Sequence, residues 1–210
     1  MPLNLHRAQA RPDWQDVPPG ERSSWQRLAA RTNGIVTPGN LVTVVGFGLS
    51  MWGVGELIGG HTWWSLILLA VGRLLDIVDG SVAQATGTKS HLGEILDAAI
   101  DKAIIGVTVV AMFIAQVAPT WLLGLFLLPH VVIVVITFAE RLRHVELHPT
   151  RLGKTTALLA WLTIPLILLT HAIGFSWHSP VGLLVMIFAL VSAAFGFITA
   201  NSYLQQQPPK

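Results

Sequence analysis

The chain has 210 residues and no cysteine, with 52% hydrophobic and 11% charged residues and a formal net charge of +2 at pH 7. Soluble domains carry about 25% charged residues, so this composition excludes a free cytosolic domain, and the lack of cysteine excludes disulfides and thiolate metal sites. The small net charge is no footprint for nucleic acid, and no nucleic acid is expected as a partner.

Residues 1–36 form a basic, proline-containing segment ahead of the first apolar stretch. No apolar run follows the first basic residues, so we do not expect a cleavable signal peptide. Residues 21–33 predict a short helix on the membrane surface, with Trp25 and Leu28 toward lipid and its arginines toward the headgroups. A solvated basic tail is the alternative.

Six hydrophobic spans follow, and each is long enough to cross an apolar layer ~30 Å thick as a helix. Breaks rich in Gly, Pro and Ser separate them. The predicted spans are residues 40–59, 62–84, 91–116, 119–141, 152–174 and 180–204. We therefore expect an all-α integral membrane bundle of six transmembrane helices, preceded by a short amphipathic interfacial helix.

The basic residues predict how the chain lies in the membrane. Eleven of the thirteen Lys and Arg residues lie in the N-terminal segment, near residues 89 and 141–154, or at the C-terminus. By the positive-inside rule both termini and these loops are cytoplasmic. The predicted parts are a cytoplasmic segment 1–36 with the juxtamembrane helix, a six-helix transmembrane domain 37–205 and a cytoplasmic tail 206–210, in a bacterial-type inner membrane.

Four aspartates lie within the second and third spans, where a carboxylate costs several kcal/mol unless it is paired, hydrated or bound to a cation. Asp76 and Asp79 are three residues apart, and Asp97 and Asp101 are four apart, so each pair occupies one helical face. The short turn between the spans makes the helices antiparallel neighbours, and the pairs can face each other near the cytoplasmic surface. Oxygen ligands on stiff helices suit Mg²⁺, Mn²⁺ or Ca²⁺, and paired metals are typical of phosphoryl transfer.

Small residues lie beside these acids, at Gly80, Ala83 and Gly93. Without large side chains there, a flat or anionic ligand could approach the backbone. The alternative is that these residues allow the helices to pack closely in lipid.

The segment Asp76-x2-Asp79-Gly80-x2-Ala83-Gln84-x8-Gly93-x3-Asp97-x3-Asp101 resembles the CDP-alcohol phosphotransferase (phosphatidyltransferase) signature, D-x2-D-G-x2-A-R-x8-G-x3-D-x3-D. Seven of the eight fixed positions match, and Gln84 stands where the family usually has Arg. The resemblance implies that an alcohol attacks the lipid-side phosphorus of a CDP-lipid and that CMP leaves. It also implies two Mg²⁺ or Mn²⁺ ions and a homodimer.

The resemblance assigns roles to individual residues. Asp76, Asp79, Asp97 and Asp101 match metal-binding positions, and Asp101 also matches the general base. The positions that contact CDP are matched by Asn40, Thr43, Gly80, Ala83, Gln84, Ser90 and Gly93. A plain helix N-cap is the alternative for Asn40. Because Gln84 brings no charge to a diphosphate, a divergent enzyme or a weakened relative with a scaffold role stays open.

Four cations near the start of the fifth span are expected to bind the phosphate of the acceptor alcohol: Arg141, Arg143, Arg151 and Lys154. Ordinary positive-inside charge is the alternative. The Gly153-Lys154 and Asp101-Lys102 pairs resemble phosphatidylglycerophosphate and cardiolipin synthases, whereas Gly46-Phe47-Gly48 resembles the inositol-phosphate enzymes.

We therefore expect a phospholipid-synthesis transferase that moves a phosphatidyl group from CDP-diacylglycerol to a small alcohol. Glycerol 3-phosphate is the first acceptor, and phosphatidylglycerol, inositol phosphate and serine are alternatives. A divalent-cation transporter is the alternative of another class, because acidic residues within membrane helices also mark ion pathways.

Overall fold

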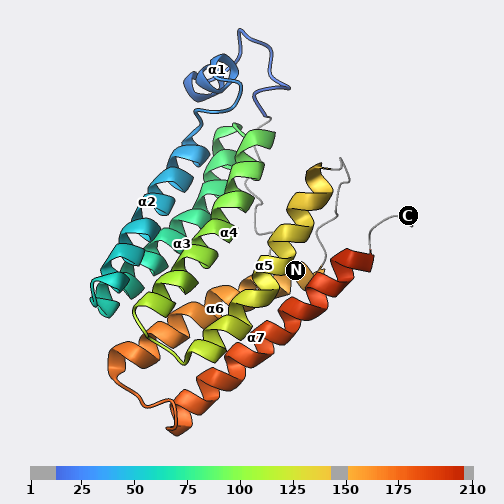
Figure 1. The fold of residues 1–210 in the computed structure, drawn as a ribbon. Coiled ribbons are helices and arrows are strands. Elements are labelled where there is room, and N and C mark those ends of the chain that lie inside the picture. Colours follow the sequence, from blue (N-terminus) through green and yellow to red (C-terminus); the bar gives the residue numbers. More distant parts are fainter. Residues whose placement is uncertain (1–12, 143–150, 206–210) are drawn as a thin grey trace, which may run out of the picture. The chain divides into compact units, whose positions relative to one another are not determined.

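The computed structural model describes residues 13–142 and 151–205, with the backbone alone for residues 91–92, 94–99 and 140–142. In these ranges the chain forms helices and no strands, which confirms the all-α prediction (Figure 1). The helices are α1 (Ser24–Arg31), α2 (Pro38–Ile58), α3 (Thr62–Thr86), α4 (His91–Ile114), α5 (Thr120–Leu142), α6 (Arg151–Ile173) and α7 (Pro180–Gln205). From α2 to α7, each helix begins and ends within two residues of a predicted span.

The ends of the helices follow from local chemistry. Pro38 opens α2, where the fixed φ of its ring suits a helix and its missing N–H costs nothing. Thr37 caps the same helix, because its hydroxyl accepts a hydrogen bond of 3.1 Å from the backbone N–H of Asn40. Gly60 and Gly87 follow α2 and α3 with φ of 83° and 63°, a backbone conformation that favours glycine.

Within the described residues, four helices are long and apolar enough to cross a membrane: Pro38–Ile58, Thr120–Ala139, Arg151–Ile173 and Pro180–Gln205. These helices indicate a membrane protein. Helices α3 and α4 have 25 and 24 residues, which suffices in length, but they carry the charged residues of the signature. Their crossing of the membrane, and with it the count of six spans, stays a prediction.

The chain divides into two compact units, Met1–Met51 with Leu68–Asp101, and Trp52–Ile67 with Lys102–Lys210. The first unit contains α1 and parts of α2, α3 and α4, and it holds the four aspartates and all the predicted CDP-binding residues. The second unit contains α5, α6 and α7.

In the first unit, α2 and α3 approach closely at Gly46 and Gly72. A Cβ atom on Gly72 would lie 2.7 Å from the carbonyl oxygen of Gly46 and closer still to the hydroxyl of Ser50, which donates to that carbonyl at 2.9 Å. Small residues permit such contacts between helix backbones. The close crossing brings Thr43, one turn before Gly46, within reach of Asp79, two turns after Gly72.

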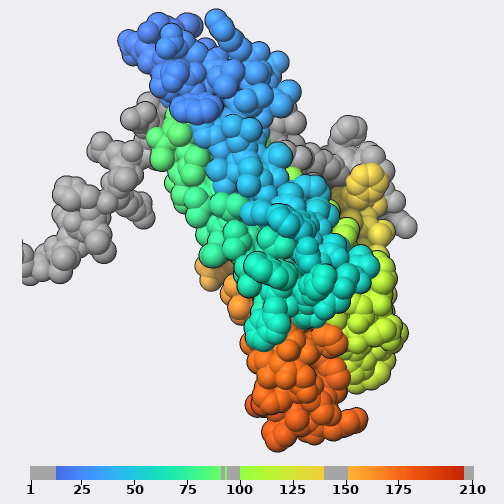
Figure 2. Space-filling model, turned by 90° about the vertical axis from the view of Figure 1, so that its left-hand side faces the viewer, coloured from blue at the N-terminus to red at the C-terminus, as the bar shows by residue number. Residues whose placement is uncertain are grey.

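The N-terminal segment contains the expected short helix, α1. Ser23 and Gln26 form a capping box at its start. Trp25 is exposed, whereas Gln26 and Ala29 are buried and Leu28 is half-buried. The helix lies against the turn after α3, since the side chain of Gln26 donates to the carbonyl of Gly87 at 3.3 Å. Figure 2 shows the blue N-terminal residues against the green end of α3. Contact of α1 with a membrane surface stays a prediction.

In the second unit, α7 packs against both α5 and α6. Ile136 on α5 lies with Ala200 and Tyr203 on α7 in a small apolar cluster. The hydroxyls of Thr156 on α6 and Thr199 on α7 form a buried hydrogen bond of 2.7 Å between the two helices.

Candidate functional site

A hydrogen bond between α2 and α3 lies at the centre of the predicted site. The hydroxyl of Thr43 donates to Oδ2 of Asp79, and both side chains are buried. A charge-assisted hydrogen bond of this kind is about twice as strong as one between neutral groups. It fixes the orientation of Asp79, one of the predicted metal ligands, toward α2.

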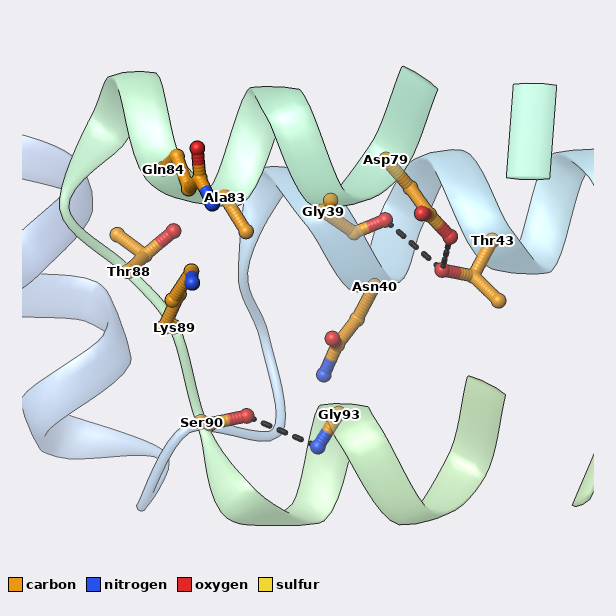
Figure 3. Close-up of a pocket in the computed structure, with 11 residues that line it drawn as sticks. Gly39, Asn40, Thr43, Asp79, Ala83, Gln84, Thr88, Lys89, Ser90 and Gly93 are labelled. Atoms are coloured by element: carbon orange, nitrogen blue, oxygen red, sulfur yellow. Dashed lines mark hydrogen bonds between the residues drawn. The ribbon is translucent and has the colours of Figure 1, made fainter. Parts of the chain in front are cut away.

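Beside this bond the first unit has a pocket of about 180 Å³ (Figure 3). All seven predicted CDP-binding residues line it, together with four residues from α2, α3 and the turn before α4. The described lining residues are Gly39, Asn40, Thr43, Asp79, Gly80, Ala83, Gln84, Thr88, Lys89, Ser90 and Gly93. Residues from three helices, up to 54 positions apart, therefore share one cavity.

Asn40 is not the N-cap of α2, because Thr37 has that role. Its side-chain amide instead donates to the carbonyl oxygens of Gly34 and Ile35, at 3.1 and 2.9 Å. The amide oxygen faces α4, since a Cβ atom on Gly93 would lie 2.7 Å from it. The alternative of a plain N-cap is wrong, and Asn40 joins the N-terminal segment to the wall of the pocket.

The three small residues of the signature have different surroundings. Gly80 faces open space, with no atom within 4 Å of an added Cβ. Gly93 packs tightly against Asn40, and the methyl group of Ala83 would lie 3.0 Å from a Cβ on Gly39. Close helix packing therefore explains Ala83 and Gly93, while Gly80 leaves room for a ligand beside the backbone.

The N-terminal segment holds the turn between α3 and α4, which forms one side of the pocket. The backbone N–H of Trp14 donates to the carbonyl of Gly87 at 2.9 Å, and its indole N–H donates to the carbonyl of Lys89 at 3.1 Å. The hydroxyl of Ser90 donates to the carbonyl of Gly34 at 3.0 Å. The sequence analysis did not predict these contacts, because the partners are far apart in the chain and no local pattern marks them.

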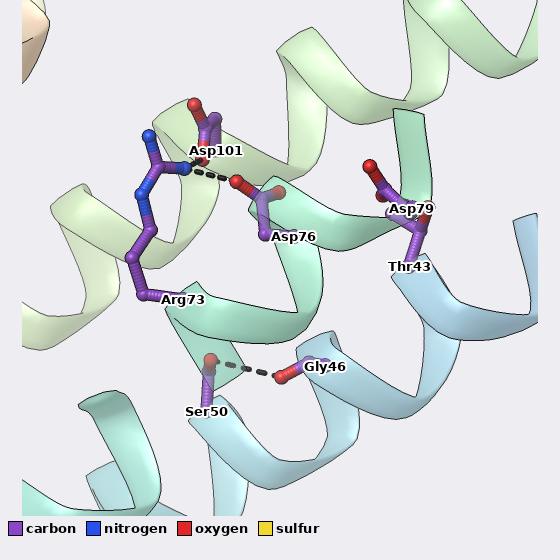
Figure 4. A network of polar contacts seen from close by, with 7 residues as sticks. All are labelled: Thr43, Gly46, Ser50, Arg73, Asp76, Asp79 and Asp101. Atoms are coloured by element: carbon purple, nitrogen blue, oxygen red, sulfur yellow. Dashed lines mark hydrogen bonds and ion pairs between the residues drawn. The ribbon is translucent and has the colours of Figure 1, made fainter. Parts of the chain in front are cut away.

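A second polar network lies between α3 and α4 (Figure 4). Nη1 of Arg73 donates to Oδ2 of Asp76 and to Oδ1 of Asp101, the latter at 2.7 Å. The three side chains are 27%, 13% and 28% exposed, so the charges are largely shielded from solvent. The sequence analysis missed this role of Arg73. Arg73 lies three residues before Asp76, and this spacing alone indicates that the two side chains share one helical face.

The three signature aspartates whose side chains are described thus point in two directions. Asp76 and Asp101 converge on one nitrogen atom of Arg73, whereas Asp79 points toward Thr43. No group of three Asp, Glu or His side chains in the described part of the chain is arranged to hold a metal ion. Asp97 lies in α4, but its side chain is outside the described atoms.

These residues fit a divalent cation in their chemistry. Oδ2 of Asp76 on α3 and Oδ1 of Asp101 on α4 both contact Nη1 of Arg73. The place between these two helices therefore accommodates positive charge. Carboxylate oxygens are the ligands that Mg²⁺ and Mn²⁺ prefer. Asp76 and Asp101 would be the described ligands of such an ion.

The predicted acceptor residues are not part of the first unit. Arg151 and Lys154 are exposed in the first turn of α6, in the second unit. Arg141 is described by its backbone alone, in α5, and Arg143 lies outside the described residues. Their role in binding an acceptor phosphate stays a prediction.

Comparison with known proteins establishes the class of this membrane protein. The chain belongs to the CDP-alcohol phosphatidyltransferase family, which it matches over residues 35–198. The resemblance seen in the signature is confirmed, and the chain is an enzyme of phospholipid synthesis rather than a cation transporter.

Individual relatives agree with this assignment. The chain is 28% identical to the cardiolipin synthase (CMP-forming) of Streptomyces coelicolor over 165 residues, which cover 75% of this chain and 76% of the relative. It is 39% identical over 67 residues to the archaetidylinositol phosphate synthase of Pyrococcus horikoshii, covering 32% of this chain and 35% of that protein. The corresponding Aeropyrum pernix enzyme is 44% identical over 55 residues, 26% of this chain and 28% of its own length. No solved structure matches the chain.

Proposed function

We propose that this chain transfers a phosphatidyl group from CDP-diacylglycerol to a small phosphorylated alcohol, first of all glycerol 3-phosphate, and releases CMP. The pocket in the first unit carries this proposal, because the seven residues predicted to bind CDP lie around it together with Asp79. Gly80 leaves one side open for a ligand. The family supplies the donor class, a CDP-alcohol.

The residues support an in-line transfer. The acceptor hydroxyl forms a bond to the lipid-side phosphorus, the bond from that phosphorus to the CMP oxygen breaks, and Asp101 accepts the hydroxyl proton. Arg73 orients the carboxylate of Asp101 through its ion pair. Asp76, Asp79, Asp97 and Asp101 would hold two Mg²⁺ or Mn²⁺ ions, which when bound supply positive charge for the phosphoryl oxygens.

The charges near the start of α6 bear on the identity of the acceptor. Arg141, Arg143, Arg151 and Lys154 offer cations for a phosphate, which favours a phosphorylated alcohol. The similarity to a cardiolipin synthase over three quarters of the chain favours phosphatidylglycerol as the second candidate. The shorter matches to archaetidylinositol phosphate synthases keep inositol phosphate as a comparison substrate.

The arrangement in the membrane is also proposed. Six spans place both termini and the pocket at the cytoplasmic face, because the basic residues lie on that side. The parts 1–36, 37–205 and 206–210 are the N-terminal segment, the catalytic domain and the tail. The working form is a homodimer, as the resemblance to the family implies.

A panel of acceptors tests the proposal. The purified protein in detergent is given labelled CDP-diacylglycerol, Mg²⁺ or Mn²⁺, and one of glycerol 3-phosphate, phosphatidylglycerol, inositol phosphate or serine. We expect CMP release and a labelled lipid with glycerol 3-phosphate. If only phosphatidylglycerol gives a labelled product, phosphatidylglycerol is the acceptor and glycerol 3-phosphate is not. If none of the four acceptors leads to CMP release, the proposal is contradicted.

Two variants separate the acceptor from the donor in the same assay. Arg151→Met and Lys154→Met should raise KM for glycerol 3-phosphate several-fold and leave KM for CDP-diacylglycerol unchanged, because they remove cations from α6 and not from the pocket. An unchanged KM for the acceptor in both variants contradicts the predicted phosphate site.

A further inference from the structure

The pocket is poor in positive charge for a site that receives a diphosphate. Among the described residues that line it, Lys89 is the one cation and Asp79 the one anion. Gln84, which replaces the Arg of the signature, is uncharged. We propose that Lys89 binds the diphosphate of the CDP-alcohol and supplies the charge that Gln84 lacks; this inference rests on the proposed function.

Most hydrogen-bond donors of the pocket are already engaged within the protein. Thr43 donates to Asp79, Ser90 donates to a backbone carbonyl, and the amide of Asn40 donates to two backbone carbonyls. The side chains of Lys89 and Gln84 form no hydrogen bond or ion pair with any residue that the structure describes. Among the described residues that line the pocket, these two side chains therefore remain to bind a ligand, and of the two only Lys89 brings charge.

The backbone of Lys89 is held in place although its side chain is exposed. Its N–H donates to Oδ1 of Asp13 at 3.3 Å, and its carbonyl accepts from the indole of Trp14 at 3.1 Å. The start of the same turn is held by two hydrogen bonds to the carbonyl of Gly87, one from the backbone N–H of Trp14 and one from the side chain of Gln26. Figure 3 shows Lys89 on the wall of the pocket, between Thr88 and Ser90. Fixing the backbone lowers the entropy cost of placing the ammonium group on a ligand.

Gln84 and Lys89 line the same cavity from the end of α3 and from the turn that follows it. Both side chains are exposed, so a guanidinium at position 84 would have room. A cation at either position can therefore serve the same phosphate groups. Charge introduced at position 84 should therefore replace charge lost at position 89, which a purely structural role of Lys89 would not produce.

The test measures equilibrium binding of CDP to the purified full chain in detergent, by calorimetry. Lys89→Met should weaken CDP binding about tenfold, because a charge-assisted contact is lost. Lys89→Arg should bind within about threefold of the wild type, and Gln84→Arg combined with Lys89→Met should recover most of the loss. Arg27→Met is the matched control, since it removes one exposed positive charge from α1, outside the pocket.

Cytidine serves as a second probe, because it has the base and ribose and no phosphate. Competition by millimolar cytidine should be the same in Lys89→Met and in the wild type. The inference is overturned if Lys89→Met binds CDP as tightly as Arg27→Met, if it loses cytidine as strongly as CDP, or if Gln84→Arg gives no recovery. A wild type that binds no CDP overturns the proposed function as well, whereas normal wild-type binding with an unaffected Lys89→Met overturns this inference alone.

Discussion

Arg73 on α3 and Asp101 on α4 form an ion pair in which Nη1 lies 2.7 Å from Oδ1. The same nitrogen donates to Asp76, so one guanidinium joins two predicted metal ligands from different helices. Both carboxylates are less than one third exposed, and each would be costly there without a positive partner. Arg73 thereby stabilises the pairing of α3 with α4.

Arg73→Met should lower the thermal midpoint of the metal-free protein, because the partly buried carboxylates lose this shared partner at a cost of about 1–3 kcal/mol. Added Mg²⁺ should raise the midpoint of the variant more than that of the wild type, since the ion supplies the missing charge. Arg73→Lys keeps the charge and should lie between the two. Equal midpoints of Arg73→Met and the wild type without metal would show that the pair contributes no stability.

The bond between Thr43 and Asp79 gives a second prediction. Thr43→Val has nearly the same volume but cannot donate, and it leaves a buried carboxylate without this bond. The cost should be about 1–3 kcal/mol in the free energy of unfolding, with a clear loss in the rate of CMP release. Thr43→Ser keeps the hydroxyl and is the control. If Thr43→Val and Thr43→Ser unfold at the same denaturant concentration, the hydrogen bond does not contribute to the free energy of unfolding.

Some features of the fold and the site follow from local sequence, and others depend on how the helices pack. The spans and the signature were predictable, because hydropathy and the spacing of the acids are local properties of the chain. The resemblance named Asn40 and Thr43 as residues of the site, and the small residues beside the acids predicted room for a ligand. Neither observation placed these residues around one cavity. The pairing of Arg73 with Asp101 depends on how α3 and α4 pack, and no local pattern contains that information.

Two further features were hidden for the same reason. The contacts of Asp13 and Trp14 with Lys89 join segments 75 and 76 residues apart. The tight packing of Gly46 and Gly72 depends on the crossing of α2 and α3, which no local pattern contains. Composition could not show it, since Gly48 is just two residues away and has open space around it.

This difference between glycines is itself testable. Gly72→Ala should destabilise the protein by about 1–3 kcal/mol, because its Cβ would meet the backbone of Gly46 and the hydroxyl of Ser50. Gly48→Ala is the matched control on α2, and no atom lies within 4 Å of its added Cβ. Denaturant unfolding in detergent should separate the two variants. Equal stability of Gly72→Ala and Gly48→Ala would contradict the close crossing.

Gly80 offers a variant that changes the pocket and not the fold. Gly80→Ala adds a methyl group into open space, so the thermal midpoint should not fall. The group occupies room beside the pocket, and KM for CDP-diacylglycerol should rise several-fold while KM for the acceptor stays constant. A midpoint and both KM values equal to those of the wild type would show that no ligand approaches the backbone at Gly80.

The most direct measurement of the central claim is the metal dependence of CMP release by the wild type and by Asp101→Asn. Asparagine keeps the shape of the side chain but has neither the negative charge nor the capacity to accept the proton. We expect release of CMP from CDP-diacylglycerol that requires Mg²⁺ or Mn²⁺, stops with a chelator, and falls by about 10²-fold or more in the variant. Asp16→Asn, an exposed acid of the N-terminal segment, should retain the wild-type rate. CMP release that persists in the chelator, or that is the same in Asp101→Asn and the wild type, would contradict the account.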